Sequence, residues 1–137
     1  METQTKTALA KFTNDQDFKR MCIDLLKALN YEKVELKPLA KKHAITFLEG
    51  VSKGVALDTL GEDTVQEFKD DLTEILLCGP IKIIFFTNRE ISANQRKKLF
   101  ALVNATEVSF LEIYDLKRIK SLLDNRFTDI RTKYLKI

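Results

Sequence analysis

The clearest periodic pattern lies near the start of the chain. Apolar residues recur at helical spacing through residues 18–29, which is typical of the buried stripe of an amphipathic helix. Asn14 or Asp15 can cap this helix by accepting a backbone N–H, and Asn30 is a suitable stop. Residues 1–12 show no period, so we expect a flexible N-terminal segment ahead of the helix.

Three short apolar runs with β-branched residues follow. They cover residues 34–36, 44–48 and 55–57, and they are separated by Pro38 and by the glycine-containing stretch 50–54. Strands of this length bounded by turn residues are the expected structure. The last two strands should form a hairpin in which the glycines supply the turn.

A second helical pattern covers residues 65–76, within a helical stretch that we place at 62–77. Asp63 or Thr64 can cap its start, and Gly79-Pro80 ends it, because glycine tolerates a left-handed cap and proline cannot continue a helix.

The second half alternates strands with helices. The nearly uninterrupted apolar run 81–86 predicts a central strand covered on both faces. Ser92 and Gln95 form a capping box that opens the next helix. A further strand is predicted at 108–113.

Two more helices are predicted after that strand. Asp115 can cap the first, and the tail 126–137 carries inward-facing apolar residues for the second. The strand–helix–strand unit favours parallel strands joined by a right-handed crossover. The pattern therefore predicts one α/β domain over residues 13–137, a three-layer sandwich with a mixed central sheet of about five strands flanked by helices.

Composition agrees with this class. Apolar residues make up 45% and charged residues 31% of 137, as in ordinary globular domains. Because no apolar run approaches the ~20 residues that cross a bilayer, and the N-terminus lacks a secretory pattern, we expect no membrane contact and a cytoplasmic location. Cys22 and Cys78 are then expected to be free thiols, and with His43 alone they lack zinc-ligand spacing.

Charge divides the chain into two unequal halves. Residues 1–81 hold 11 Lys/Arg against 14 Asp/Glu, whereas residues 82–137 hold 12 against 6. Lysine and arginine contacts release counterions from nucleic acid, so the basic half is a candidate phosphate-facing surface. The candidate nucleic-acid-binding residues are Arg89, Arg96, Lys97, Lys98, Lys117, Arg118 and Lys120.

The loop 87–90 is a candidate ligand site, because ligands of open α/β sheets gather beyond the carboxyl ends of parallel strands. Arg89 could bind a phosphate or carboxylate there, or could simply pair with a neighbouring acid. Dinucleotide-binding and phosphate-loop glycine motifs are absent. His43 has no serine or cysteine nucleophile in a recognisable motif, so histidine-based catalysis is disfavoured.

Residues 18–31, 83–92 and 129–137 carry a resemblance to a known family: they are similar to parts of restriction-endonuclease-like domains of the PD-(D/E)XK, Mrr type. Residues 18–31 resemble the opening helix of that family. Residues 83–92 resemble a strand and its following loop, and residues 129–137 are similar to the end of such domains. The resemblance implies a restriction-endonuclease-like fold and cleavage of DNA by an Asp on one central strand with a Glu-x-Lys on the next. The acids would hold a divalent metal that polarises the phosphate and activates water.

This chain departs from that catalytic pattern. Glu67-Phe68-Lys69 matches the Glu-x-Lys letters, but it falls inside the helical pattern. Residues two apart on a helix point about 200° from one another, so Glu67 and Lys69 would not converge on one metal. No catalytic set is therefore assigned, and the residues to test are Asp58, Glu67 and Lys69, with Glu49 as a substitute acid.

Three functions follow from these observations. The favoured interpretation is a catalytically degenerate nuclease-like module, without a cofactor, that binds nucleic acid or a partner protein. The alternatives are a Mg²⁺-dependent DNA endonuclease with a non-standard carboxylate site, and an oligomerising or adaptor domain without nucleic-acid contact, in which a hydrophobic edge strand pairs between subunits.

Overall fold

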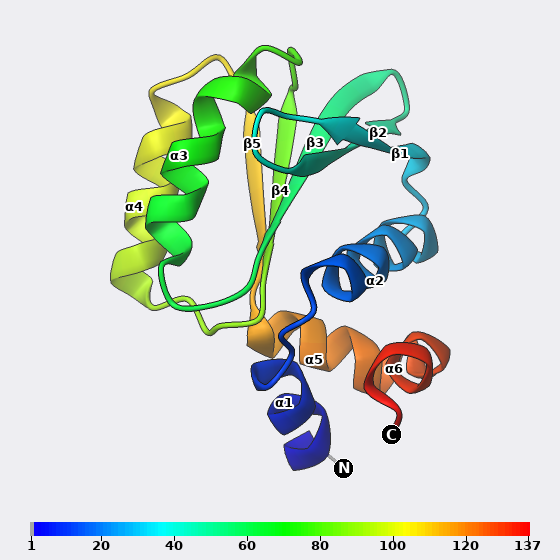
Figure 1. The fold of residues 1–137 in the computed structure, drawn as a ribbon. Coiled ribbons are helices and arrows are strands. Elements are labelled where there is room, and N and C mark those ends of the chain that lie inside the picture. Colours follow the sequence, from blue (N-terminus) through cyan, green and yellow to red (C-terminus); the bar gives the residue numbers. More distant parts are fainter. Residues whose placement is uncertain (1) are drawn as a thin grey trace.

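A computed structural model describes residues 2–137 of the chain (Figure 1). Over this range the helices and strands follow the order predicted from the sequence, with one additional helix at the start. The elements are α1 (Glu2–Ala10), α2 (Asp15–Ala28), β1 (Glu32–Pro38), β2 (His43–Glu49), β3 (Ser52–Thr59), α3 (Thr64–Leu76), β4 (Lys82–Thr87), α4 (Ala93–Asn104), β5 (Phe110–Tyr114), α5 (Leu116–Asn125) and α6 (Thr128–Leu135).

The five strands form one mixed sheet in the order β1-β2-β3-β4-β5. β1, β2 and β3 pair antiparallel, and β3, β4 and β5 pair parallel. Parallel neighbours need a crossover, which α3 supplies between β3 and β4 and α4 supplies between β4 and β5. The mixed sheet of five strands and the parallel pairing in the second half were both predicted correctly.

Helices cover both faces of this sheet (Figure 1). Side chains alternate along β4, so that Ile84 and Phe86 pack with α1, α2, α5 and α6, whereas Ile83 and Phe85 pack with α3 and α4. Two apolar cores, one on each side of a central sheet, make the predicted three-layer arrangement. None of the helices formed by residues 2–137 combines the length and apolarity required to span a membrane.

Most of the predicted helix caps are present. Asn14 accepts a hydrogen bond from the backbone of Asp17 ahead of α2, and Ser92 and Gln95 form the reciprocal capping box of α4. Asp115 caps α5 through Arg118 N, 3.1 Å away. The cap predicted for α3 differs, because Asp63 precedes that helix without a side-chain hydrogen bond to it.

The glycines of the β2–β3 hairpin have two different roles. Gly50 adopts a φ of +62° in the turn, as expected. Gly54 instead lies inside β3, where a Cβ atom would overlap the ring of Phe47 on β2. That ring is held edge-on against Tyr31, with 4.8 Å between centroids. Close packing, and not the turn, requires the second glycine.

The N-terminal segment 1–12, which was expected to be flexible, contains a helix; Met1 lies outside the described residues. Residues 2–10 form α1, in which Thr5 and Leu9 are fully buried against α5 and its surroundings. The amide of Asn88 donates to the carbonyl of Leu9, 3.0 Å away, and Thr5 donates to Asp124. Contacts with distant residues therefore hold a helix that has too few apolar positions to show a period.

Candidate functional site

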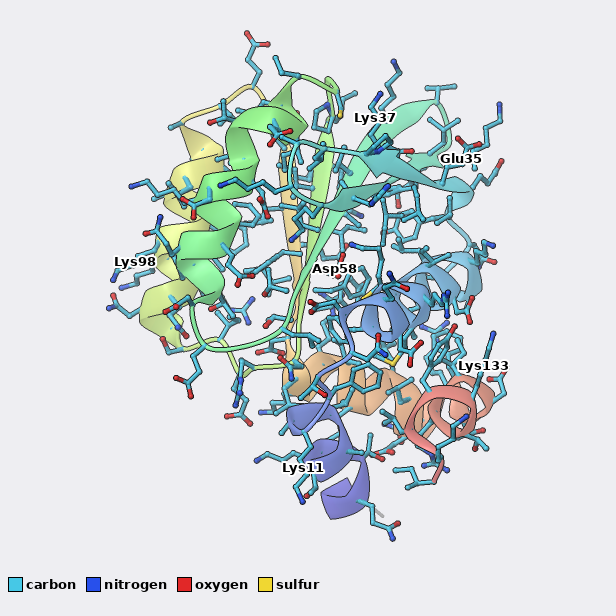
Figure 2. All side chains as sticks on the ribbon, in the orientation of Figure 1. Lys11, Glu35, Lys37, Asp58, Lys98 and Lys133 are labelled. Carbon is cyan, nitrogen blue, oxygen red and sulfur yellow. The ribbon has the colours of Figure 1, made fainter. Side chains whose placement is uncertain are left out.

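Asp58 stands at the carboxyl end of β3 with its side chain directed toward α2. It pairs in register with Phe86 of β4, and only 6% of it is exposed. Lys19 of α2 forms an ion pair with the Asp58 carboxylate and also donates to the carbonyl of His43, 2.7 Å away. Figure 2 labels Asp58 at the centre of the molecule, between the sheet and α2. The only charge on this buried end of β3 is thus offset by a lysine.

A second lysine contacts the same end of β3. Lys42, in the loop between β1 and β2, donates to the backbone carbonyl of Asp58, 3.0 Å away. Its ammonium group also pairs with Asp71 of α3 at 3.1 Å. Lys42 thereby links the end of β3 to α3.

These residues border a cavity of about 360 Å³, which we call the Asp58 cavity. It is lined by Asp15, Lys19, Lys41, Lys42, Asp58, Thr59, Leu60, Glu67, Asp70 and Asp71. Burial raises the pKa of Asp58, although the charge of Lys19 works in the opposite direction. Burial also raises the pKa of Glu67; Lys42 works against this shift, and the carboxylates of Asp71 and Asp15 reinforce it.

The structure brings together only part of the proposed catalytic set. Glu67 and Lys69 both lie on α3, so the prediction of a helix over this stretch is correct. Glu67 reaches the Asp58 cavity, whereas Lys69 is exposed and does not line it. Glu49 lies at the far end of the hairpin, where it pairs with Lys82 at 3.5 Å. Among the described residues, no group of three or more His, Cys, Asp or Glu side chains is arranged to hold a metal ion.

The predicted basic residues cluster around the carboxyl ends of β4 and β5. Arg89 follows β4, while Arg96, Lys97 and Lys98 lie on α4 and Lys117, Arg118 and Lys120 lie on α5. Both helices begin at this edge of the sheet (Figure 1). A cavity of about 740 Å³, which we call the lysine cavity, opens there. It is lined by Lys6, Glu90, Ile91, Asp115, Leu116, Lys117 and Lys120.

Only some of these basic residues form ion pairs with acidic side chains. Arg118 pairs with Glu112, Arg96 lies 3.8 Å from Asp115, and Lys120 lies 3.6 Å from Asp124. Lys97, Lys98, Lys117 and Arg89 have no carboxylate partner in the part of the chain that the structure describes. Lys98 lies on the side of α4 that faces away from the sheet (Figure 2).

Arg118 has a further role at the outer edge of β5. Its guanidinium donates to the carbonyl of Ile113, 3.1 Å away, and stacks over the ring of Tyr114 at 3.9 Å. One end of this edge strand is therefore covered by a charged side chain. At the other end Phe110 leaves 62% of its surface exposed.

Sequence reasoning did not identify Lys6, Lys19, Lys42 or Asp71 as site residues. Lys19 immediately follows the buried Phe18 on α2, and a lysine beside an apolar stripe is a weak signal that would have selected it. The other three residues gave no such signal, because their partners come from distant elements.

A scan against protein-family models and searches of curated proteins and of solved structures found no match to this chain.

Proposed function

We propose that the chain is a nuclease-like module without catalytic activity, which binds the nucleic-acid backbone at the start of α4 and α5. The observation that carries this proposal is the lysine cavity, where Lys6, Lys117 and Lys120 meet at the carboxyl ends of β4 and β5. α4 adds three basic residues and contains no acid. Lys6 pairs with Glu90 and Lys120 with Asp124, whereas Lys117 and, on α4, Lys97 and Lys98 have no carboxylate partner among the described residues. Cations clustered on one surface are the electrostatic requirement for binding phosphates.

Two neighbouring strands, β2 and β3, support the absence of catalysis. The family that the chain resembles would carry an Asp on one strand and a Glu-x-Lys on the next. β2 contains no Asp, and the neighbouring positions of β3 that face α2 are Ala56 and Asp58. If β3 is the strand that would carry the Glu-x-Lys, then Ala56 and Asp58 stand at those positions, and the Asp58 carboxylate is paired with Lys19.

The test compares two charge-reversal variants of equal net charge. K97E/K117E alters exposed lysines of the proposed surface, and K37E/K53E alters exposed lysines elsewhere. Binding to a fluorescently labelled DNA duplex and to the matching single strand is measured by anisotropy at low salt. We expect K97E/K117E to weaken binding by at least about tenfold and K37E/K53E to leave it within about twofold. No binding by the unaltered chain, or equal weakening by both variants, would overturn the proposal.

A metal-dependent nuclease is the second candidate, because Asp58 and Glu67 line one cavity. That function requires Asp58 to exchange its contact with Lys19 for a metal ion. Cleavage of plasmid DNA with Mg²⁺ or Mn²⁺ that disappears in D58A would establish this function, and uncut plasmid would eliminate it.

A further inference from the structure

Part of the sheet lacks a helical cover on one face. α3 and α4 lie over β3, β4 and β5, while β1 and β2 extend beyond them (Figure 1). Of these two strands, only Ala44 contributes to the buried core on the side of α3. A groove of about 600 Å³ lies on this uncovered part, between the strands and the end of α3. We call it the hairpin groove, and it is independent of the proposed nucleic-acid surface.

The hairpin groove contains apolar side chains that the fold leaves accessible. Leu48, Leu39 and Cys78 are half-buried there, whereas Val55 also lines the groove but has only 2% of its surface exposed. Leu77, which follows the last turn of α3, is 86% exposed. A large apolar side chain held at the wall of a groove is a suitable contact for an apolar side chain of a partner.

Lysines without acidic partners surround these apolar residues. Lys33, Lys37 and Lys53 line the groove and are exposed, and none forms an ion pair with a side chain that the structure describes. Of the two glutamates that line the groove, Glu74 accepts a hydrogen bond from Ala40 N at 2.9 Å. Figure 2 labels the other, Glu35, together with Lys37 beside β1. Three lysines against two glutamates give the lining of the groove a net charge of +1, which favours an acidic partner.

The exposed edge of β1 is poorly suited to pairing with a strand of a partner, so a partner would be recognised through its side chains. Pro38 lacks a backbone N–H, and the register with β2 shifts between Glu32 and Glu35. Lys33 has a positive φ of 50° in the same stretch. A bulge, a proline and lysines are features that protect an edge strand from pairing with another chain. A partner would accordingly lie across the groove and not extend the sheet.

We infer that the hairpin groove docks an extended acidic segment of a partner protein. An apolar side chain of that segment packs against Leu77 and Leu48. Its carboxylates face Lys33, Lys37 and Lys53.

The experiment uses the ¹⁵N-labelled full chain and three short synthetic peptides, in which Glu alternates with Leu, Lys with Leu, or Glu with Ser. Amide chemical shifts are recorded during titration with each peptide. We expect the Glu–Leu peptide alone to shift the amides of Lys33, Lys37, Lys53 and Leu77. The absence of shifts, shifts confined to other elements, or equal shifts with the Lys–Leu peptide would overturn the inference.

Two variants separate this inference from the nucleic-acid proposal. K37E/K53E should weaken binding of the Glu–Leu peptide by about tenfold, since two attractive charges become repulsive, and L77S should weaken it comparably. K97E/K117E should leave peptide binding unchanged, and the spectrum of each variant reports whether it folds. Equal weakening by both charge variants would overturn the inference. A DNA duplex that shifts the same groove amides would also overturn it. So would self-association in sedimentation velocity, accompanied by shifts of these amides that disappear on dilution.

Discussion

Lys19 and Asp58 form an ion pair that joins α2 to the carboxyl end of β3, although 39 residues separate them in the chain. Only 15% of the lysine side chain and 6% of the aspartate side chain are exposed. Removing one partner of a buried pair leaves a charge without compensation, whereas removing both avoids that cost.

We therefore predict that K19M lowers the free energy of unfolding by about 3 kcal/mol. The double variant K19M/D58N should recover most of this loss, because no charge remains on the buried carboxyl group. Urea unfolding followed by circular dichroism measures both values. K133M, which removes an exposed lysine paired with Asp24, is the control and should show no comparable change. Equal losses in K19M and the double variant would contradict the role given to Asp58.

The stability of the chain should depend on pH in opposite ways through two aspartates. Burial raises the pKa of Asp58. The folded state therefore binds the Asp58 proton more tightly than the unfolded state, and stability falls as pH rises from near the ordinary Asp pKa, about 3.9, through the raised pKa. D58N removes this term, so its stability relative to the unaltered chain should increase across that window.

Asp24 provides the opposite case. Although burial acts to raise the pKa of Asp24, hydrogen bonds from Tyr134 and Lys133 lower it overall. Its contribution is present above the ordinary Asp pKa and is lost as pH falls through the lowered pKa. D24N should therefore be less stable than the unaltered chain above the ordinary Asp pKa, and this difference in stability should disappear as pH falls through the lowered pKa of Asp24. Urea midpoints measured across the acid range test both variants, and parallel pH profiles for D58N and D24N would contradict this assignment.

Gly54 and Phe47 should show strong coupling. G54A should lower the free energy of unfolding by about 2 kcal/mol, because the added methyl group overlaps the Phe47 ring and forces it away from Tyr31. F47L creates space at that position, so the double variant G54A/F47L should lose less than the sum of the single variants. Additive losses in urea unfolding would mean that the ring does not restrict residue 54.

Arg118 should protect the edge of β5 from pairing with a second chain. R118A removes the side chain that bonds to the carbonyl of Ile113 and covers Tyr114. We expect this variant to self-associate at lower protein concentration than the unaltered chain, as measured by sedimentation velocity. Adding F110S, which removes the exposed aromatic ring of the same strand, should reverse the change. An R118A variant that sediments like the unaltered chain would show that Arg118 does not protect the edge.

The fold followed largely from local patterns. The helical period in residues 65–76 and the apolar run 81–86 identified α3 and β4, and the Ser92–Gln95 box identified the start of α4. These signals are local because caps and periodicity depend on near neighbours. α1 was not predicted, because Leu9 and Thr5 contact residues that are distant in the sequence, such as Asp124.

The candidate sites could be predicted only in part. The carboxyl ends of the parallel strands followed from topology, and so did the basic residues gathered there. The sequence did not reveal that Lys19 would offset Asp58, nor that Lys42 would join the end of β3 to Asp71, because both contacts depend on how α2, α3 and a loop pack around β3. Lys6 reaches the lysine cavity only because α1 is helical.

The salt dependence of DNA binding is the decisive measurement for nucleic-acid binding at the start of α4 and α5. For each of three proteins, the logarithm of the affinity for one duplex is plotted against the logarithm of the salt concentration. Each lysine that contacts a phosphate contributes about 0.9 to the magnitude of the slope. We predict that K97E/K117E lowers this magnitude by about 2, while K37E/K53E retains the slope of the unaltered chain. Three identical slopes, or binding that does not depend on salt, would contradict nucleic-acid binding at the start of α4 and α5.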